Sequence, residues 1–155
     1  MANDEWETPP ALFAALDAEF HFDLDAAATD TNAKCVAHFT RANSALTQPW
    51  ATHGKRVFCN PPYSRPNLDA FLAKAYIESR EDCEVVVLLV KADTSTRWWH
   101  RWVMQAEEVR VLKGRVNHYI RGEPAPKSSN RFDSAIVIFD RSRRVPVLTT
   151  MDVPK

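Results

Sequence analysis

An uninterrupted run of six apolar residues, Val-Val-Val-Leu-Leu-Val at positions 85–90, constrains the fold of this chain more than any other segment. The run has the length of a strand and no polar residue on either face, which is typical of a strand buried in the middle of a parallel sheet. A helical pattern precedes it and begins at Pro66. Its apolar residues are Leu68, Phe71, Leu72, Ala75 and Tyr76. Together with a shorter apolar run at 57–59, these segments predict a strand–helix–strand unit with a right-handed crossover.

The shorter run ends at the tetrapeptide Asn60-Pro61-Pro62-Tyr63. Proline cannot donate a hydrogen bond to a sheet, and Pro61 favours an extended conformation at Asn60. We therefore expect Asn60 at the carboxyl end of a strand, where open α/β sheets bind their ligands. The side-chain carbonyl of Asn60 and the backbone carbonyl of Pro61 offer two fixed acceptors to one NH2 group. Tyr63 offers a flat face for an aromatic ring.

Two acceptors of this kind can activate an amine attached to a purine or pyrimidine ring. The lone pair of such an amine is delocalised into the ring, so the amine is a poor nucleophile. Acceptors on both N–H bonds favour a tetrahedral nitrogen whose lone pair can attack, which is electrostatic preorganisation toward the transition state. No metal and no covalent intermediate are needed. A plain proline turn after a strand also explains the tetrapeptide, so its surroundings decide between the two interpretations.

The tetrapeptide resembles the catalytic signature of amino-group methyltransferases that use S-adenosylmethionine, which include DNA adenine-N6, DNA cytosine-N4 and protein glutamine enzymes. The segment Asp-Leu-Asp-Ala-Ala-Ala at 23–28 is similar to that of the bacteriophage-type DNA N6-adenine methyltransferases, often called Dam-like, although Ala stands here where Gly is usual. The resemblance extends from Trp6 to about Phe139. It includes the segments Asn32-Ala33-Lys34-Cys35, Phe39-Thr40 and Lys113-Gly114-Arg115-Val116.

This resemblance implies a compact, Rossmann-like class I methyltransferase fold. We expect a single α/β domain over residues 1–155, without a separate target-recognition domain. Its sheet should be mostly parallel, with an antiparallel strand or hairpin near the C-terminal end. Only 35 positions separate Asp25 from Asn60, where such a fold usually has two strand–helix units. One of these units should therefore be shortened or missing.

The resemblance also implies a set of cofactor-binding residues. Asp25, at the end of the first strand, should pair with a positive group of S-adenosylmethionine, with Asp23 as the alternative, and Ala26 leaves room for the ligand. Thr8 and Pro9 match an element that lies beside the methionine end of the cofactor. A helix with Thr8 as N-cap and Pro9 at its first position explains them equally well. Polar candidates for the ribose hydroxyls or the adenine edge are Asp30, Asn32 and Thr40.

A formal net charge of zero conceals an uneven distribution. Residues 1–85 contain seven Lys and Arg against thirteen Asp and Glu, and residues 86–155 contain thirteen against seven. This split fits a protein with a cationic cofactor on one side and a polyanion on the other, although solvated surfaces explain charge blocks too. The candidate phosphate contacts are Lys91, Arg97, Arg101, Arg115, Arg121, Lys127 and Arg131. Residues 118–131 are polar and Pro-rich, which predicts a mobile loop that either overhangs the active site or only connects two strands.

Several classes of site have no support in the sequence. The cysteines, Cys35, Cys59 and Cys83, lack zinc or redox spacing, so we expect reduced, packed thiols. The histidines form no ligand pair at i, i+4, and no metal is expected. No apolar stretch reaches membrane-spanning length, and residues 1–7 do not resemble a signal peptide. We expect a cytoplasmic protein, encoded by a phage or prophage in a bacterial host.

The expected activity is methyl transfer from S-adenosylmethionine to the N6 amine of adenine in DNA. The target base must leave the duplex to reach Asn60, so base flipping is expected. Alternatives are methylation of cytosine N4, RNA adenine or protein glutamine, and a nucleic-acid-binding module without turnover. By resemblance, Asn at the first motif position favours adenine over cytosine. The basic second half of the chain favours nucleic acid over protein.

Overall fold

The computed structural model describes residues 3–129 and 131–155, and its centre is a seven-stranded sheet in the order β2-β1-β3-β4-β8-β5-β9. The strands are β1 (Leu24–Asp25), β2 (Ala37–His38), β3 (Arg56–Cys59), β4 (Val85–Lys91), β5 (Glu108–Lys113), β8 (Ser134–Phe139) and β9 (Val147–Asp152). All neighbours pair in parallel except β8, which runs antiparallel to β4 and β5. The expected mostly parallel sheet with a late antiparallel strand is confirmed, and it is consistent with a Rossmann-like methyltransferase fold.

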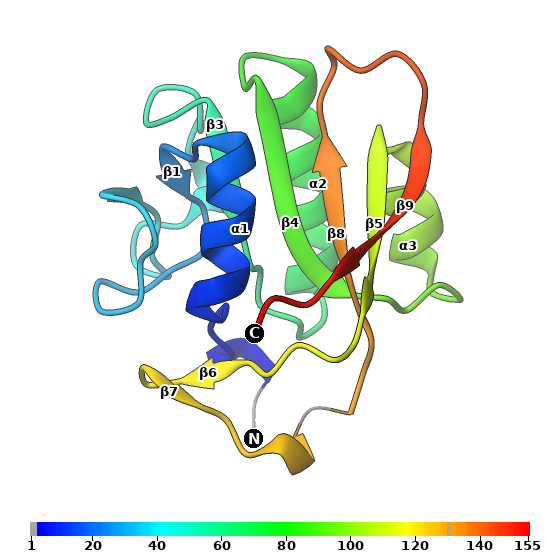
Figure 1. The fold of residues 1–155 in the computed structure, drawn as a ribbon. Helices are drawn as coiled ribbons and strands as arrows, with labels where there is room; N and C mark the ends of the chain where they lie inside the picture. Colours follow the sequence, from blue (N-terminus) through cyan, green and yellow to red (C-terminus); the bar gives the residue numbers. More distant parts are fainter. Residues whose placement is uncertain (1–2, 130) are drawn as a thin grey trace.

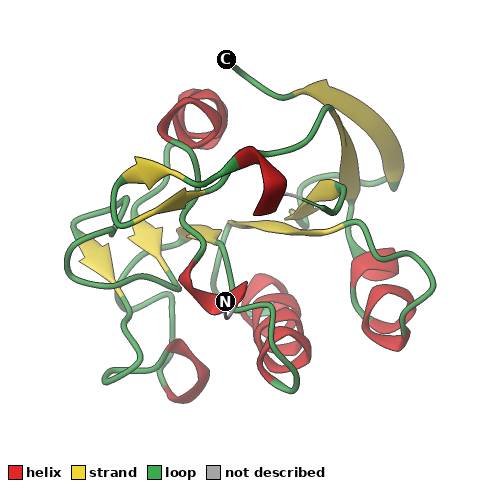
Figure 2. Cartoon of the chain, turned by 90° about the horizontal axis from the view of Figure 1, so that it is seen from below, coloured by secondary structure: helices red, strands yellow, loops and turns green. Residues whose placement is uncertain are grey.

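Helices cover both faces of the sheet (Figures 1 and 2). Helix α1 (Pro10–Phe20) lies on one face, and α2 (Asn67–Arg80) and α3 (Arg97–Arg101) lie on the other. Alternate residues of β4 enter two separate cores, so that Val87 packs on the α1 side and Leu88 on the α2 side. All six residues at 85–90 are buried, as their uninterrupted apolar sequence predicts. The cysteines are free thiols, and Cys59 and Cys83 are buried.

The connection between Asp25 and Asn60 is short, as expected. It contains the two-residue strand β2 and the 3-10 helix η2 (Ala45–Thr47), and no α-helix. Trp50 anchors this connection in the core, where it is fully buried and its indole Nε1 donates to the Ala45 carbonyl at 2.8 Å. The Trp50 backbone N–H also donates to the Glu78 carboxylate on α2 at 3.1 Å. The usual second strand–helix unit is therefore replaced by a loop that packs against the sheet.

Helix α1 begins later than the sequence predicts. Pro10, not Pro9, is its first residue, and Pro9 is the N-cap, with a ψ of 138° that is not helical. The reason is that a residue before proline is excluded from the helical region, so Pro10 keeps Pro9 extended. Thr8 makes no capping hydrogen bond and is instead buried beside the cavity described below. The prediction of Thr8 as N-cap was wrong.

Residues 118–129 contain short strands and a 3-10 helix where the composition predicts an irregular loop. Strands β6 (Tyr119–Ile120) and β7 (Glu123–Pro124) pair as a hairpin, and the 3-10 helix η4 (Lys127–Ser129) follows. Arg121 and Gly122 connect the strands with positive φ angles of 52° and 79°. Two consecutive positive φ angles are typical of a type I′ turn, the preferred two-residue hairpin connection. The hairpin lies below the main sheet, beside the start of α1 (Figure 1).

Strand β9 forms the outer edge of the sheet beside β5. Pro146 directly precedes it, and proline within a sheet is confined to edge strands and to strand starts. Val147 and Leu148 on this strand are exposed. None of the helices in the described part of the chain is long and apolar enough to cross a membrane.

Candidate active site

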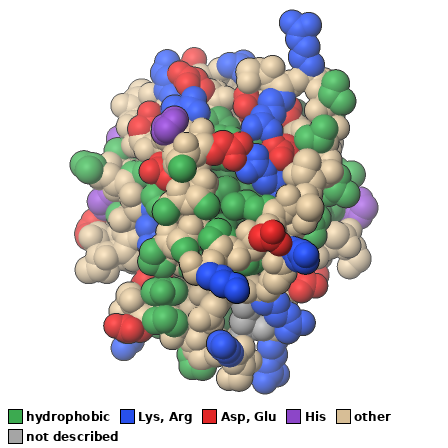
Figure 3. Space-filling model, viewed as in Figure 1, with side chains coloured by type: hydrophobic (Ala, Val, Ile, Leu, Met, Phe, Trp, Pro, Cys, Tyr) green, Lys and Arg blue, Asp and Glu red, His purple; other side chains and the backbone are tan. Residues whose placement is uncertain are grey.

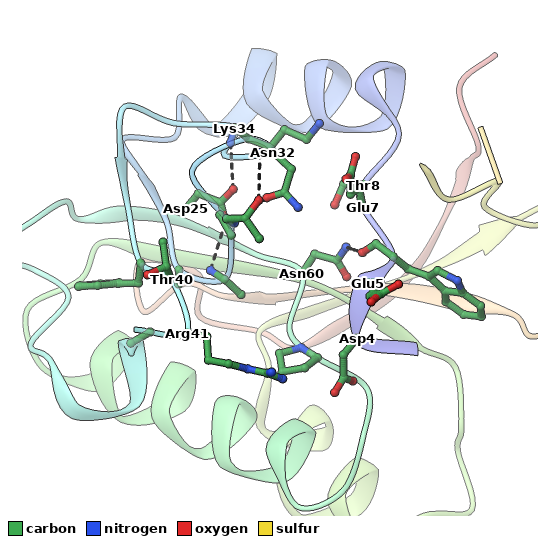
Figure 4. A pocket seen from close by; sticks show the side chains of 18 of the residues that line it. Asp4, Glu5, Glu7, Thr8, Asp25, Asn32, Lys34, Thr40, Arg41 and Asn60 are labelled. Atoms are coloured by element: carbon green, nitrogen blue, oxygen red, sulfur yellow. Dashed lines mark hydrogen bonds between the residues drawn. The ribbon is translucent and has the colours of Figure 1, made fainter. Parts of the chain in front are cut away.

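A cavity of about 880 Å³ lies where β1 and β3 end, a volume typical of small-molecule sites (Figure 4). Both catalytic and cofactor-binding candidates line it. The predicted residues in its wall are Thr8, Asp25, Ala26, Asn32, Thr40, Asn60, Pro62 and Arg121. These residues come from the N-terminal segment, the ends of two parallel strands, the segments on either side of β2 and the β6–β7 hairpin. The cavity therefore occupies the position that open α/β sheets use for ligands.

Asp25 is a buried carboxylate in the wall of this cavity. It is 2% exposed, and its oxygens accept hydrogen bonds from the backbone N–H groups of Ala27 at 3.2 Å and Lys34 at 3.0 Å (Figure 4). Burial raises the pKa of Asp25, and the N–H groups of Lys34 and Ala27 oppose this shift. No Lys or Arg side chain in residues 3–129 or 131–155 forms an ion pair with it. A cationic ligand would favour the ionised carboxylate.

Three of the predicted cofactor residues lie outside the cavity wall. Asp23 is at the amino end of β1, where its carboxylate accepts the Arg56 backbone N–H at 2.8 Å. Asp30 is at the surface and pairs with His38 at 2.9 Å. Pro9 caps α1. Of the two alternatives that the sequence left open, Asp25 lines the cavity and Asp23 does not.

Asn60 is held in one orientation by the N-terminal segment. Its side-chain Nδ2 donates to the backbone carbonyl of Trp6 at 2.9 Å. The side-chain carbonyl Oδ1 accepts no hydrogen bond from the described residues and remains available to a ligand amine. Pro62 lines the cavity beside Asn60, whereas Pro61 is buried and does not line it.

Tyr63 belongs to an aromatic cluster, which we define as Trp6, Tyr63, His118 and Phe132; Tyr63 and His118 are buried, and Trp6 and Phe132 are half-buried. The Tyr63 hydroxyl donates to the Leu89 carbonyl at 3.1 Å, and burial raises the pKa of Tyr63. Its ring is edge-on to the rings of Trp6, His118 and Phe132, with centroid distances of 6.5, 6.3 and 5.9 Å. Tyr63 does not line the cavity, but Trp6 lines the cavity and contacts Tyr63.

The N-terminal strap, residues 3–8, joins the cavity to the aromatic cluster. Asp4 accepts hydrogen bonds from the Ser64 backbone N–H at 2.9 Å and the Ser64 hydroxyl at 2.6 Å. Glu7 exchanges backbone hydrogen bonds with Tyr119 at 2.8 and 3.0 Å, and its carboxylate accepts the Gly122 N–H at 3.1 Å. The strap therefore connects Ser64, directly after the tetrapeptide at 60–63, to the β6–β7 hairpin.

Sequence reasoning missed most of these strap and cluster residues. Asp4, Glu5 and Glu7 line the cavity, as does Arg41 next to the predicted Thr40 (Figure 4). The sequence places His118 in the predicted loop and indicates no role for Phe132. The only local signal was the position of Trp6 and Glu7 beside Thr8, because the contacts of Trp6 within the cluster join residues more than 50 positions apart.

The predicted phosphate contacts do not form one surface. Lys91 is half-buried, and its ammonium lies 4.8 Å from the Phe132 ring centroid. Arg97 and Arg101 are exposed on α3, away from the hairpin (Figures 1 and 2). Arg115 pairs with Asp133 at 3.7 Å. The remaining three, Arg121, Lys127 and Arg131, are exposed on the hairpin and around η4, where Lys and Arg side chains lie on the lower part of the molecule (Figure 3).

Comparison with known proteins adds independent evidence. Residues 1–154 match the family described as DNA N-6-adenine-methyltransferase (Dam). The chain is 34% identical over 126 residues to a DNA N-6-adenine-methyltransferase of Escherichia phage T1, a match that covers 81% of this chain and 51% of that protein. It is 30% identical over 140 residues to a DNA N-6-adenine-methyltransferase of Haemophilus phage HP1 (strain HP1c1), covering 88% and 79%. The match thus spans about half the length of the phage T1 protein.

Proposed function

The chain belongs to the Dam family of DNA N-6-adenine-methyltransferases, and from this premise we propose that it transfers a methyl group from S-adenosylmethionine to the N6 amine of adenine in DNA. The observation that carries the proposal is Asn60. It lies at the end of β3 in the cavity wall, with its amide N–H held by the Trp6 carbonyl and its Oδ1 available as an acceptor.

The cavity has the chemistry that S-adenosylmethionine requires. The buried Asp25 carboxylate, whose pKa burial raises, suits a positively charged ligand group. Thr8, Asn32 and Thr40 would supply hydrogen bonds to the polar parts of the cofactor, and Phe39 contributes an apolar surface. When bound, this cofactor supplies a methyl group that its sulfonium makes electrophilic. The residues of the cavity would hold and orient the cofactor.

Asn60 and Pro61 would act on the adenine amine. The Oδ1 atom of Asn60 would accept one N–H bond of the amine, which favours a nitrogen lone pair directed at the methyl group. The carbonyl of Pro61 is the expected second acceptor, although Pro61 does not line the cavity in this structure. The carbonyl of Trp6 keeps the Asn60 amide from rotating, so the acceptor is in place before the base arrives. Alignment of amine and methyl group then supplies most of the rate enhancement. The base reaches this position by leaving the duplex, which costs a few kcal/mol of stacking and pairing.

The proposal is tested with purified protein and plasmid DNA from a host that lacks adenine methylation. Mass spectrometry of the digested DNA should detect N6-methyladenine formed from added S-adenosylmethionine. Asn60→Ala should lower kcat by about 100- to 1,000-fold, as expected for loss of one preorganised transition-state contact, while the cofactor Kd stays near the wild-type value.

Asn43→Ala is the matched control, because Asn43 is exposed and does not line the cavity. This variant should methylate DNA at the wild-type rate. Formation of N4-methylcytosine instead of N6-methyladenine would replace the proposed substrate. Activity of Asn60→Ala within a few-fold of wild type would contradict the assigned role of Asn60.

A further inference from the structure

Trp6 fills a space between the cavity and the rest of the aromatic cluster. Its indole stacks on His118, with a centroid distance of 5.2 Å and an interplanar angle of 21°. It also stacks on Phe132 at 5.0 Å and 20°, and it is edge-on to Tyr63. Trp6 is only half-buried and lines the cavity, so the ring has a route out of the cluster. The indole is two fused flat rings, as is a purine base.

The polar atoms around this ring are not satisfied by the protein. Trp6 Nε1 is buried and makes no hydrogen bond within residues 3–129 and 131–155. Both buried ring nitrogens of His118 lack a partner at normal hydrogen-bond geometry there, and only the Glu7 backbone lies close enough to act on the imidazole. Burial lowers the pKa of His118 to about 4, and Lys91 lowers it further, while the Glu7 backbone opposes the shift. The imidazole is therefore neutral near pH 7, with one donor and one acceptor nitrogen. Buried polar groups are nearly always paired, so these atoms indicate a ligand that the indole only partly replaces.

We propose that the indole of Trp6 occupies the site of the target base, and that the flipped purine displaces it to stack on His118 and Phe132. The inference rests on the proposed function, since it places the base of that reaction. The ring nitrogens and amine of adenine would pair with Asn60 on one side and with the imidazole of His118 on the other. An indole, with a single N–H, cannot satisfy both.

The side chain of Trp6 moves in this exchange, while the strap stays in place. Asp4 holds the strap to Ser64, the Trp6 carbonyl holds Asn60, and Glu7 pairs with Tyr119. Rotation of the indole toward solvent breaks none of these bonds. Asn60 is thus oriented both before and after the base enters, and Trp6 acts as an internal competitor for the base site.

This competition predicts that removing the indole lowers the KM for DNA. An ordinary stacking role for Trp6 predicts the opposite change. The apparent affinity for the base is reduced by the fraction of molecules in which Trp6 leaves the site open. If that fraction is one in ten, Trp6→Ala should lower the KM for DNA by about tenfold. If Trp6 were instead a wall on which the base stacks, the same substitution would raise this KM.

Free adenine provides a test that does not depend on methyl transfer. Millimolar adenine should raise the thermal unfolding midpoint of Trp6→Ala, because the substitution leaves a purine-sized opening beside His118, and it should leave the wild-type midpoint unchanged. Trp102→Ala is the control, since Trp102 is another half-buried tryptophan and does not line the cavity. Indole should stabilise Trp6→Ala less than adenine does, because its single N–H cannot pair with both Asn60 and His118. Equal responses of Trp6→Ala and Trp102→Ala to adenine would overturn the proposal.

Two further variants keep the inference testable if Trp6→Ala folds poorly. Trp6→Phe should lower the KM for DNA by a smaller factor and keep the fold. In the Trp6→Ala background, His118→Phe preserves the aromatic ring and removes its nitrogens, so the stabilisation by adenine should be lost. A wild-type protein without methyl transfer would refute the proposed function while the adenine measurements still report on the base site. An active wild type whose KM for DNA rises in Trp6→Ala and Trp6→Phe would refute the competition alone.

Discussion

At the scale of single residues, Asp25 is a carboxylate in a buried position, where loss of water disfavours its ionised form. Two backbone N–H groups stabilise the carboxylate, yet burial still raises its pKa. Such a group is stabilised most by a ligand that brings a positive charge and removes little further water. The buried carboxylate is therefore suited to distinguish a cationic cofactor from a neutral one.

Asp25→Asn should weaken S-adenosylmethionine binding by about tenfold, or about 1.4 kcal/mol, because the amide keeps the shape and loses the charge. Isothermal titration calorimetry of the purified protein measures this directly. Asp23→Asn is the matched control two positions away, since the Asp23 carboxylate bonds Arg56 outside the cavity. An unchanged cofactor Kd in Asp25→Asn would place the positive group of the cofactor elsewhere.

Asp25 and Asn60 could be predicted from the sequence because each ends a short apolar strand, and the ends of parallel strands meet at one edge of a sheet. The placement of Trp6, His118 and Phe132 could not be predicted. These residues meet because the backbone of Glu7 pairs with Tyr119, a long-range bridge that leaves no local pattern. Residue type also misled: Tyr63 was expected to present a ring face to a ligand, and in the structure its ring packs against other aromatic rings.

At the scale of elements, β1 is only two residues long, and its position depends on contacts outside the strand. Asp23 accepts the Arg56 N–H through its side chain and donates its own N–H to the Arg56 carbonyl. Gly54 lies directly against this pair. A Cβ at position 54 would approach the Asp23 carboxylate oxygen at 2.5 Å and the Leu24 Cβ at 2.7 Å. The close packing of Gly54 thus sets the register that carries Asp25 to the cavity.

Gly54→Ala should lower the free energy of unfolding by about 1–3 kcal/mol through overpacking, and it should also weaken cofactor binding, because β1 must shift. Chemical denaturation and calorimetry measure the two effects. Gly114→Ala is a useful comparison: its φ of 97° strains an alanine, and its nearest atom would be 3.8 Å away. This variant should lose stability without a change in cofactor Kd. Unaltered cofactor binding in Gly54→Ala would show that β1 tolerates the shift.

The elements that the sequence predicts well are those with a long hydrophobic pattern. The bounds of β4 and the start of α2 lie within one residue of those expected, because burial on one or both faces determines their sequence. The β6–β7 hairpin was missed because its strands have two residues each and its turn is Arg-Gly, whereas Asn-Gly and Asp-Gly are the stronger signals. The predicted start of α1 was one residue too early, because either of two consecutive prolines can be the first residue of a helix.

At the scale of the whole molecule, the site is assembled at one end of the sheet from segments of the entire chain. The N-terminal strap, the ends of β1 and β3, and the β6–β7 hairpin meet there (Figure 1). Exposed Arg121, Lys127 and Arg131 belong to this end, whereas Arg97 and Arg101 lie apart on α3. A DNA duplex that delivers a base to Asn60 must pass close to the hairpin. The phosphate contacts should therefore be concentrated around it.

Replacing Arg121, Lys127 and Arg131 by Ala should flatten the dependence of log DNA affinity on log salt by about two to three units, since each phosphate contact on duplex DNA contributes about 0.9. Affinity for every DNA sequence should fall alike, because phosphate contacts carry no base information. Fluorescence anisotropy across a salt series measures the slope. Replacing Lys55, Arg141 and Arg144, at the amino end of β3 and between β8 and β9, removes the same charge from the opposite end of the sheet and should leave the slope near wild type. Equal slopes for the two triple variants would exclude the hairpin as the DNA contact and direct attention to Lys91, Arg97 and Arg101.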